Sequence, residues 1–186
     1  MVFIYLNNKR TNDEKAATEI GKVLNIYDAG ATDSRQYPIA INGLPERGVM
    51  GLKAIVENYG GTGSGELARF YLANAYFNLH QYDEALRHFE SFSGDGDLLR
   101  ASAEAGAAAC YEVKGSYSRA AEKYEKAANR ISNAAQTPDY LNAAARCFGS
   151  SGEKEKAIAL LKRLKKEFPT STAARDADRY IALFSA

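Results

Sequence analysis

Few residues in this chain have the types and spacing that catalysis or metal binding needs. The histidines, His80 and His88, lie eight residues apart across a predicted turn. No cysteine or carboxylate set completes a metal-ligand spacing around them. The sequence also offers no charged or histidine-bearing cleft, so we expect neither an enzyme nor a metal site.

Residues 60–65 are rich enough in glycine to suggest a phosphate-binding loop. The segment follows a predicted helix, however, and Glu66 stands where such a loop needs a lysine. We therefore predict a helix-ending turn, with Ser64 capping the next helix. Residues 95–97 lack the remaining ligands and the terminal glutamate of a calcium loop, and they predict a turn and a cap. No cofactor is expected.

The charges of the chain nearly cancel, because 24 lysines and arginines face 23 acids. That balance removes the electrostatic case for nucleic acid or anionic membranes as general partners. One segment is locally basic through Lys154, Lys156, Lys162, Arg163, Lys165 and Lys166, partly offset by Glu153, Glu155 and Glu167. This segment is either a solvated face or a contact for acidic protein or lipid headgroups.

A four-residue frame recurs three times and predicts the elements that position every other residue. Its members are two large side chains, an alanine and a further large apolar residue, spaced by six, three and four. The copies are Tyr76, Tyr82, Ala85, Phe89; Tyr111, Tyr117, Ala120, Tyr124; and Phe148, Lys154, Ala157, Leu161. They are offset by 35 and 37 residues, a period typical of stacked helix pairs.

The frame predicts regular helix pairs at residues 64–92, 96–131 and 138–168, followed by one capping helix at 171–184. A divergent first pair is expected at 12–59, with a helix from a cap at Asn12 to Tyr27 and a second helix at 46–59. An insert at 28–44 separates these two helices. Gly48 is predicted to fill the small-residue position of an imperfect earlier repeat.

Two further features concern apolar side chains. Cys110 and Cys147 fall at equivalent points of successive repeats, on helices roughly 9 to 10 Å apart, so we expect buried side chains rather than a disulfide. Residues 1–6 are apolar and are followed by Asn7, Asn8, Lys9 and Arg10. Three interpretations of residues 1–11 stay open. The segment is the remnant of a membrane anchor that has more apolar residues upstream, or it is a disordered start, or it is an apolar start packed on the first pair.

The repeats resemble tetratricopeptide repeats. The resemblance rests on Leu72, Ala73 and Tyr76, on the run Gly115, Tyr117, Ala120, Tyr124 and Ala127, and on the trailing Pro169, and it covers roughly residues 46–186. Departures are the missing tryptophan, Phe92 and Leu164 in place of small residues, and His80 in place of glycine. The resemblance implies an all-α fold, a right-handed superhelix of antiparallel helix pairs with a C-terminal capping helix, forming a single domain over 12–186.

A narrower resemblance concerns bacterial, membrane-tethered ancillary factors of the general secretion translocon. It rests on the apolar start, the polar first helix, residues 37–43, and residues 59–62 before Leu67 and Ala68. It implies a tether at the bacterial cell membrane with the repeats on the extracytoplasmic side; otherwise the chain is expected in the cytoplasm.

The resemblance to tetratricopeptide repeats also implies that the first helix of each pair lines a concave groove, and that this groove binds a protein or peptide segment. The predicted groove residues are Phe70, Asn74, Phe77, Asn78, Glu112, Asn142 and Arg146, accompanied by Ala105, Ala109, Val113, Gly149 and Ser150. A partner with an apolar anchor near the phenylalanines and an acid near Arg146 would suit it. The lysine and asparagines of the carboxylate clamp of chaperone-binding repeats are not reproduced.

Each groove residue has an alternative interpretation. Phe70 and Phe77 can instead be core to the preceding pair, and Asn74, Asn142 and Arg146 can be solvated or capping residues. The groove can also be filled by the chain's first thirty residues. As a function, we expect a non-catalytic protein-interaction scaffold at the bacterial envelope that assists export or envelope assembly. The alternative is a self-associating structural module that pairs through the apolar insert at 37–44 or through the capping helix.

Overall fold

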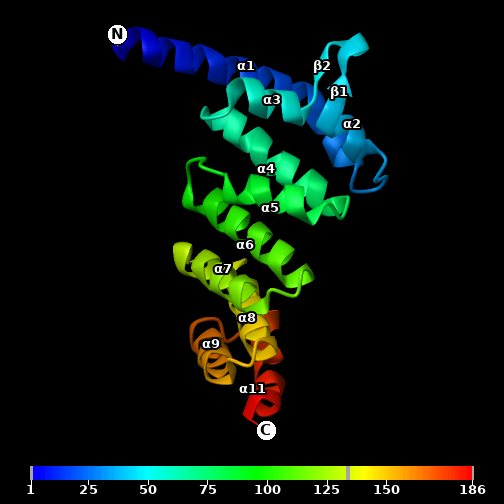
Figure 1. The fold of residues 1–186 in the computed structure, drawn as a ribbon. Helices are drawn as coiled ribbons and strands as arrows, with labels where there is room; N and C mark the ends of the chain where they lie inside the picture. Colours follow the sequence, from blue (N-terminus) through cyan, green and yellow to red (C-terminus); the bar gives the residue numbers. More distant parts are fainter. Residues whose placement is uncertain (1, 133–134, 186) are drawn as a thin grey trace. The chain divides into compact units, whose positions relative to one another are not determined.

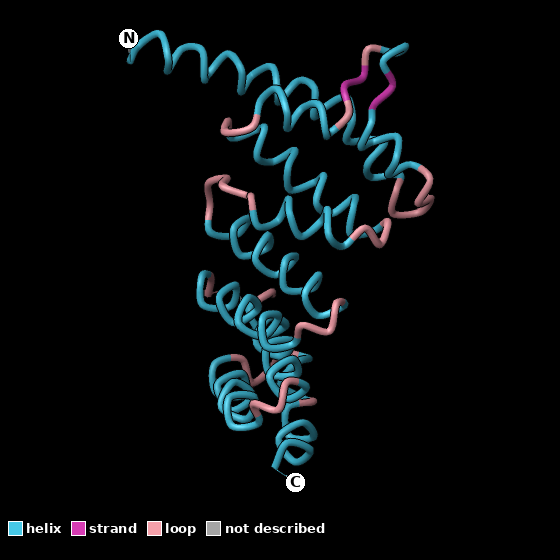
Figure 2. Tube along the Cα trace, in the orientation of Figure 1, coloured by secondary structure: helices cyan, strands magenta, loops and turns pink. Residues whose placement is uncertain are grey.

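The computed structural model describes residues 2–132 and 135–185, with side chains described from residue 7 onward. Its elements are almost all helices, and the chain divides into two compact units, one ending at Asp95 and one beginning at Gly96. Figure 1 shows the order of the elements along the chain, and Figure 2 separates helices, strands and loops. We describe each unit by itself.

The first unit contains a long helix, a small hairpin with a 3-10 helix between its strands, and four further α-helices. Its elements are α1 (Val2–Ala29), α2 (Gln36–Asn42), β1 (Gly43–Leu44), the 3-10 helix η1 (Pro45–Arg47), β2 (Val49–Met50), α3 (Leu52–Tyr59), α4 (Gly63–Asn78) and α5 (Tyr82–Glu90). β1 and β2 are antiparallel, with Gly43 opposite Met50. The predicted pair at 64–92 corresponds to α4 and α5.

The second unit contains two regular pairs and a C-terminal segment. Its elements are α6 (Asp97–Val113), α7 (Tyr117–Arg130), α8 (Thr137–Ser150), α9 (Lys154–Glu167), α10 (Thr172–Arg175) and α11 (Ala177–Ser185). The predicted pairs at 96–131 and 138–168 correspond to α6–α7 and α8–α9. The prediction of one capping helix at 171–184 was wrong, because the segment is broken at Asp176. Ala173, Ala174 and Ala177, on either side of the break, are all buried.

The prediction for residues 12–59 was wrong in three places. α1 is continuous from Val2, so Asn12 lies inside a helix and caps nothing. The insert contains α2 and β1, and its apolar side chains Tyr37, Ala40 and Ile41 are buried in the first unit. The second helix begins at Leu52 rather than 46, because Gly48 ends η1 in the left-handed region (φ 65°). Gly48 is exposed and fills no small-residue position.

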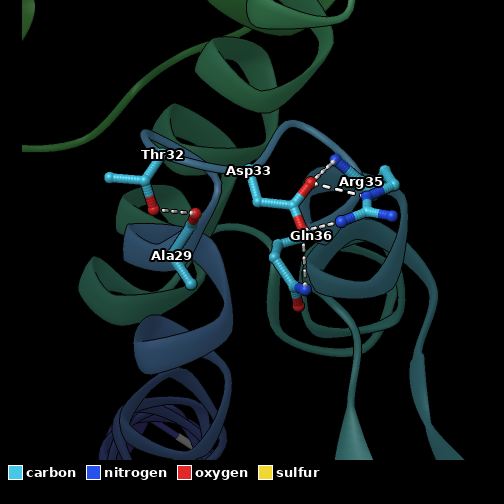
Figure 3. A network of polar contacts seen from close by, with 5 residues as sticks. All are labelled: Ala29, Thr32, Asp33, Arg35 and Gln36. Carbon is cyan, nitrogen blue, oxygen red and sulfur yellow. Dashed lines mark hydrogen bonds and ion pairs between the residues drawn. The ribbon is translucent and has the colours of Figure 1, made fainter.

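A polar network holds the turn between α1 and α2 (Figure 3). The Asp33 carboxylate accepts hydrogen bonds from the backbone and guanidinium of Arg35 and from Gln36, while the Thr32 hydroxyl donates to the carbonyl of Ala29. The bonds from Arg35 lower the pKa of Asp33 to about 2. The turn therefore keeps a charged carboxylate that fixes its direction into α2.

The N-terminus of α4 is capped from two sides, and neither cap is the predicted Ser64. The Thr62 hydroxyl accepts from the backbone N–H of Gly65 at 3.0 Å. Asp13 on α1 accepts from the backbone N–H of Ser64 at 2.6 Å, which lowers the pKa of Asp13. A helix N-terminus attracts anions. Here the chain's own carboxylate occupies that place.

Replacing Asp13 by alanine is expected to lower the free energy of unfolding by about 1 kcal/mol, because α4 loses a charged cap at its N-terminus. Urea denaturation of the purified protein measures this change. Glu14→Ala is the matched control, since the ion pair of Glu14 with Arg10 is 3.7 Å long and highly exposed. Equal stability of the two variants would show that the contact between Asp13 and Ser64 stabilises nothing.

The cores of the two units follow the repeat frame. The frame alanines Ala85, Ala120 and Ala157 are all completely buried, as close crossing of paired helices requires. The turn residues His80, Gly115 and Gly152 occupy equivalent positions and all have positive φ, of 59°, 73° and 88°. This conformation explains why glycine is usual there, and His80 adopts it without being a glycine.

Candidate protein-interaction surface

The predicted groove residues of α4 mostly have partners inside the first unit. Phe70 lies edge-on to Phe89 and Phe92, with 6.1 Å between ring centroids in both cases. Phe77 lies edge-on to Tyr82 at 5.4 Å. Both phenylalanines are half-buried, and these ring contacts join α4 to α5 and the residues after it. They therefore pack within their own pair.

The two α4 amides also bond internally. Asn74 Nδ2 donates to the carbonyl of Phe70 at 2.8 Å, one turn earlier in the helix. Asn78 Nδ2 donates to the Tyr37 hydroxyl of α2 at 3.0 Å. Tyr27, near the end of α1, lies edge-on to both Tyr37 and Tyr71. The segment from Tyr27 to Tyr37 thus packs against α4, so part of this helix is covered by the chain itself.

In the second unit an ion pair joins two first helices. Arg146 Nη2 of α8 donates to Glu112 Oε1 of α6 at 2.6 Å, and the Tyr124 hydroxyl of α7 donates to Glu112 Oε2 at 3.0 Å. The side chains of Arg146 and Glu112 are 42% and 28% exposed. The positive charge that would meet an acidic partner is therefore already offset by Glu112.

Asn142 lies one turn before Arg146 on α8 and has an unpartnered polar atom. Its Oδ1 is buried and accepts no hydrogen bond from the described residues. On α6, the first two predicted groove positions are small: Ala105 is buried and Ala109 half-buried. We call Ala105, Ala109, Glu112, Asn142 and Arg146 the α6–α8 face. It combines a shallow floor, an unsatisfied amide and an arginine with several unused donors.

Comparison with known protein families matches residues 67–93 and 143–171 to the tetratricopeptide repeat. These segments cover most of α4–α5 and α8–α9, and they contain the first and third copies of the repeat frame. The fold is tetratricopeptide-like. Neither the search of curated proteins nor the search of solved structures found a significant match. The helices of the structure and the repeat match confirm the expected all-α class. Association with a translocon stays a prediction.

The C-terminal helix α11 covers one of the predicted groove positions on α8. A side chain at Gly149 would meet the ring of Phe184 of α11 at about 2.2 Å. Gly149 was predicted to line the groove, but Phe184 already lies against it. Sequence reasoning predicted only a cap position for Phe184 and only a core position in the repeat frame for Tyr124. The contacts of these two side chains with Gly149 and Glu112 were therefore missed. Neither contact has a short-range signal.

The cysteines of the tetratricopeptide-like core are both buried. Burial and the neighbouring Glu112 carboxylate together raise the pKa of the Cys147 thiol to about 12. A thiol with such a pKa stays protonated at neutral pH and is a poor nucleophile. Cys147 therefore contributes apolar volume beneath the α6–α8 face.

The histidines serve local structure. His80 Nδ1 lies 2.7 Å from the Tyr82 hydroxyl. His88 is buried and stacked on Tyr76, with Nε2 2.9 Å from the Arg87 guanidinium. Burial, with nearby Arg87 and Arg69, lowers the pKa of His88 to about 4. Because arginine only donates, Nε2 of His88 accepts and the proton lies on Nδ1, which has no partner among the described residues.

Glu66, the residue in the lysine position of the supposed phosphate loop, is a buried structural acceptor. It accepts from Arg69 Nε at 3.0 Å and from the backbone N–H groups of Gly61 and Ser93 at 3.3 and 2.7 Å. The carboxylate thus ties the start of α4 to the loop after α5. Among the described residues, no group of three or more histidines, cysteines and acids is placed to hold a metal ion.

Proposed function

We propose that this chain is a non-catalytic protein-interaction scaffold whose α6–α8 face binds a segment of another protein. Tetratricopeptide repeats generally bind protein partners, which supports the class of function. The observation that carries the proposal is the buried Asn142 Oδ1 without a donor, because an unsatisfied buried acceptor is unfavourable until a donor reaches it. Because this oxygen has almost no exposed surface, the partly exposed Asn142 side chain would turn outward on binding, and a backbone N–H of the bound segment would then supply the donor.

Arg146 is proposed to contribute orientation rather than a free positive charge. Glu112 engages one of its five donors and neutralises it. The remaining donors can reach carbonyl oxygens of a bound segment without breaking the pair. The small side chains of Ala105 and Ala109 let a peptide backbone approach closely. Phe70, Phe77, Asn74 and Asn78 on α4 are proposed only as secondary contacts, because their rings and amides already have partners.

The direct test is selection of peptides from a displayed library of twelve-residue sequences, followed by measured dissociation constants for the selected peptides. Asn142→Ala and Arg146→Gln are each expected to weaken binding about tenfold, which corresponds to about 1.4 kcal/mol for a lost hydrogen bond. Asn25→Ala, at an exposed amide on α1, is the matched control and should bind normally. Arg146→Glu is unsuitable, because the new carboxylate would face Glu112 and destabilise the fold.

Two outcomes would refute this assignment. Selected peptides that bind the Asn142→Ala variant as tightly as the wild type would remove the α6–α8 face from recognition. Failure to select any peptide, with self-association rising with concentration in sedimentation, would favour the self-associating module. The insert at 37–44 is a weak candidate for the pairing surface of such a module, because its apolar side chains are largely buried within the first unit.

We also propose, from the sequence resemblance, that the scaffold is tethered at the bacterial cell membrane, faces the extracytoplasmic side and assists export. α1 is helical from Val2, so an upstream apolar helix would continue into it without a break. Within the part of the chain that the structure describes, no helix is both long and apolar enough to cross a bilayer. Carbonate extraction of membranes from the native host, using the full native gene, tests the tether. Release into the soluble fraction would refute it.

A further inference from the structure

A second surface lies on α9, which contributes no residue to the α6–α8 face. We propose that Lys154, Lys162 and Lys166, which we call the α9 lysine stripe, dock an acidic segment of a partner protein. All three are exposed. Their spacing of eight and four residues places them within one third of the helix circumference.

The lysines of the stripe lack the ion pairs that the neighbouring cations have. Lys156 pairs with Glu153 at 2.6 Å, Arg163 with Glu167 at 3.0 Å, and Lys165 with Asp178 at 2.5 Å. Lys154, Lys162 and Lys166 have no ion-pair partner among residues 2–132 and 135–185. The stripe therefore presents three uncompensated charges along about 18 Å of helix.

The fold does not require this charge. α5, α7 and α9 are the second helices of successive pairs and have the same structural role. α5 has one cation and three acids, α7 has four cations and two acids, and α9 has six cations and two acids. Their formal charges are thus −2, +2 and +4. Helices of either net charge therefore occupy the same place in the fold, so the charge of α9 is free to serve another purpose.

Helix stability accounts for only part of the stripe. A cation in the last turn, such as Lys166, interacts favourably with the helix dipole. Lys154 is the first residue of α9, where the dipole disfavours a cation, and the other two frame copies have Tyr82 and Tyr117 at this position. Lys162 and Lys166 repel each other at a spacing of four. Local structure thus explains Lys166 alone.

An acidic protein segment fits the stripe better than a membrane or a nucleic acid. Membrane-surface helices combine cations with apolar side chains that insert among lipids. The exposed large apolar residues of the described chain, Leu98, Val113, Tyr117 and Leu183, all lie outside α9. Single-stranded nucleic acid would need exposed aromatic rings for base stacking, which α9 lacks in sequence. An extended acidic segment of about five or six residues would span the stripe.

The test uses a fluorescent sixteen-residue poly-glutamate peptide and the full chain, with binding followed by anisotropy at 50 and 300 mM salt. The triple variant Lys154→Gln, Lys162→Gln, Lys166→Gln is expected to bind at least tenfold more weakly at low salt, and the wild type should weaken as salt rises. The matched control is Lys15→Gln, Arg47→Gln, Lys53→Gln, which removes the same charge from exposed positions in the first unit. It should bind within twofold of the wild type.

Three results would overturn the proposal. Equal weakening in both triple variants would show an effect of net charge alone. Retained binding in the stripe variant would place any acidic contact elsewhere. Tighter, stripe-dependent binding to vesicles containing phosphatidylserine, or to single-stranded RNA, would replace the protein partner by that class. Replacement of the three lysines by arginine should retain binding, and thermal unfolding of each variant checks that the fold is intact.

Discussion

Replacing Glu66 by alanine is expected to lower the free energy of unfolding by about 3 kcal/mol. Glu66 is only 3% exposed and accepts hydrogen bonds from Arg69, Gly61 and Ser93. Its removal leaves a largely buried guanidinium and two backbone N–H groups without their acceptor. Urea denaturation measures the loss. Glu66→Gln keeps an acceptor oxygen and should lose about half as much.

The Glu66 effect should also depend on pH. Burial raises the pKa of this carboxyl, but the hydrogen bonds from Ser93 and Arg69 outweigh burial, so the pKa lies below its usual value of 4.5. A carboxyl with a lowered pKa stabilises the fold above the unfolded pKa and loses that contribution as pH falls through the folded one. The difference between wild type and Glu66→Ala should therefore shrink below about pH 4.5.

The control for Glu66 is Glu57→Ala, an exposed acid on α3 that should change stability by less than about 0.5 kcal/mol. If Glu66→Ala were as stable as Glu57→Ala, the carboxylate would not tie α4 to the loop after α5. The slope of the unfolding free energy against urea concentration should be the same in both variants, which would confirm that the same transition is compared.

Replacing Ala120 by leucine is expected to lower the free energy of unfolding by about 1 to 3 kcal/mol, because three added carbons must enter a filled helix crossing. Ala120 is 0% exposed, as are its frame equivalents Ala85 and Ala157. Thermal or urea denaturation measures the loss. Ala159→Leu, at an exposed position of α9, is the matched control and should be nearly neutral. A neutral result at Ala120 as well would show that the register is wrong.

The repeat frame could be predicted from the sequence because it is a local, periodic signal. Each copy places its alanine at a helix crossing and its turn residue at a positive φ, and both features occupy the expected positions in all three copies. The regular pairs follow from that periodicity. The first pair has no such repeat, so Gly48 was misplaced and α1 was expected to begin ten residues too late.

The features missed by sequence reasoning depend on contacts between residues far apart in the chain. Asp13 caps α4 across 51 positions, and its local sequence is equally compatible with a cap of its own helix. Glu112 neutralises Arg146 across 34 positions, so the side chain predicted to attract an acid is already paired. Residue type and spacing identified Asn142 and Arg146 as neighbours, but only the packed helices reveal which has a partner.

The measurement that tests the central claim most directly is site-specific photocrosslinking in the native host, with the photoreactive residue at Val113, which is 55% exposed on α6 beside the α6–α8 face. A second probe at Asn25 on α1 serves as the control position. We predict a discrete crosslinked protein at Val113, absent at Asn25, whose yield falls about tenfold when Asn142→Ala is added. Crosslinks of equal yield at both positions, or a Val113 crosslink unaffected by Asn142→Ala, would contradict recognition through this face.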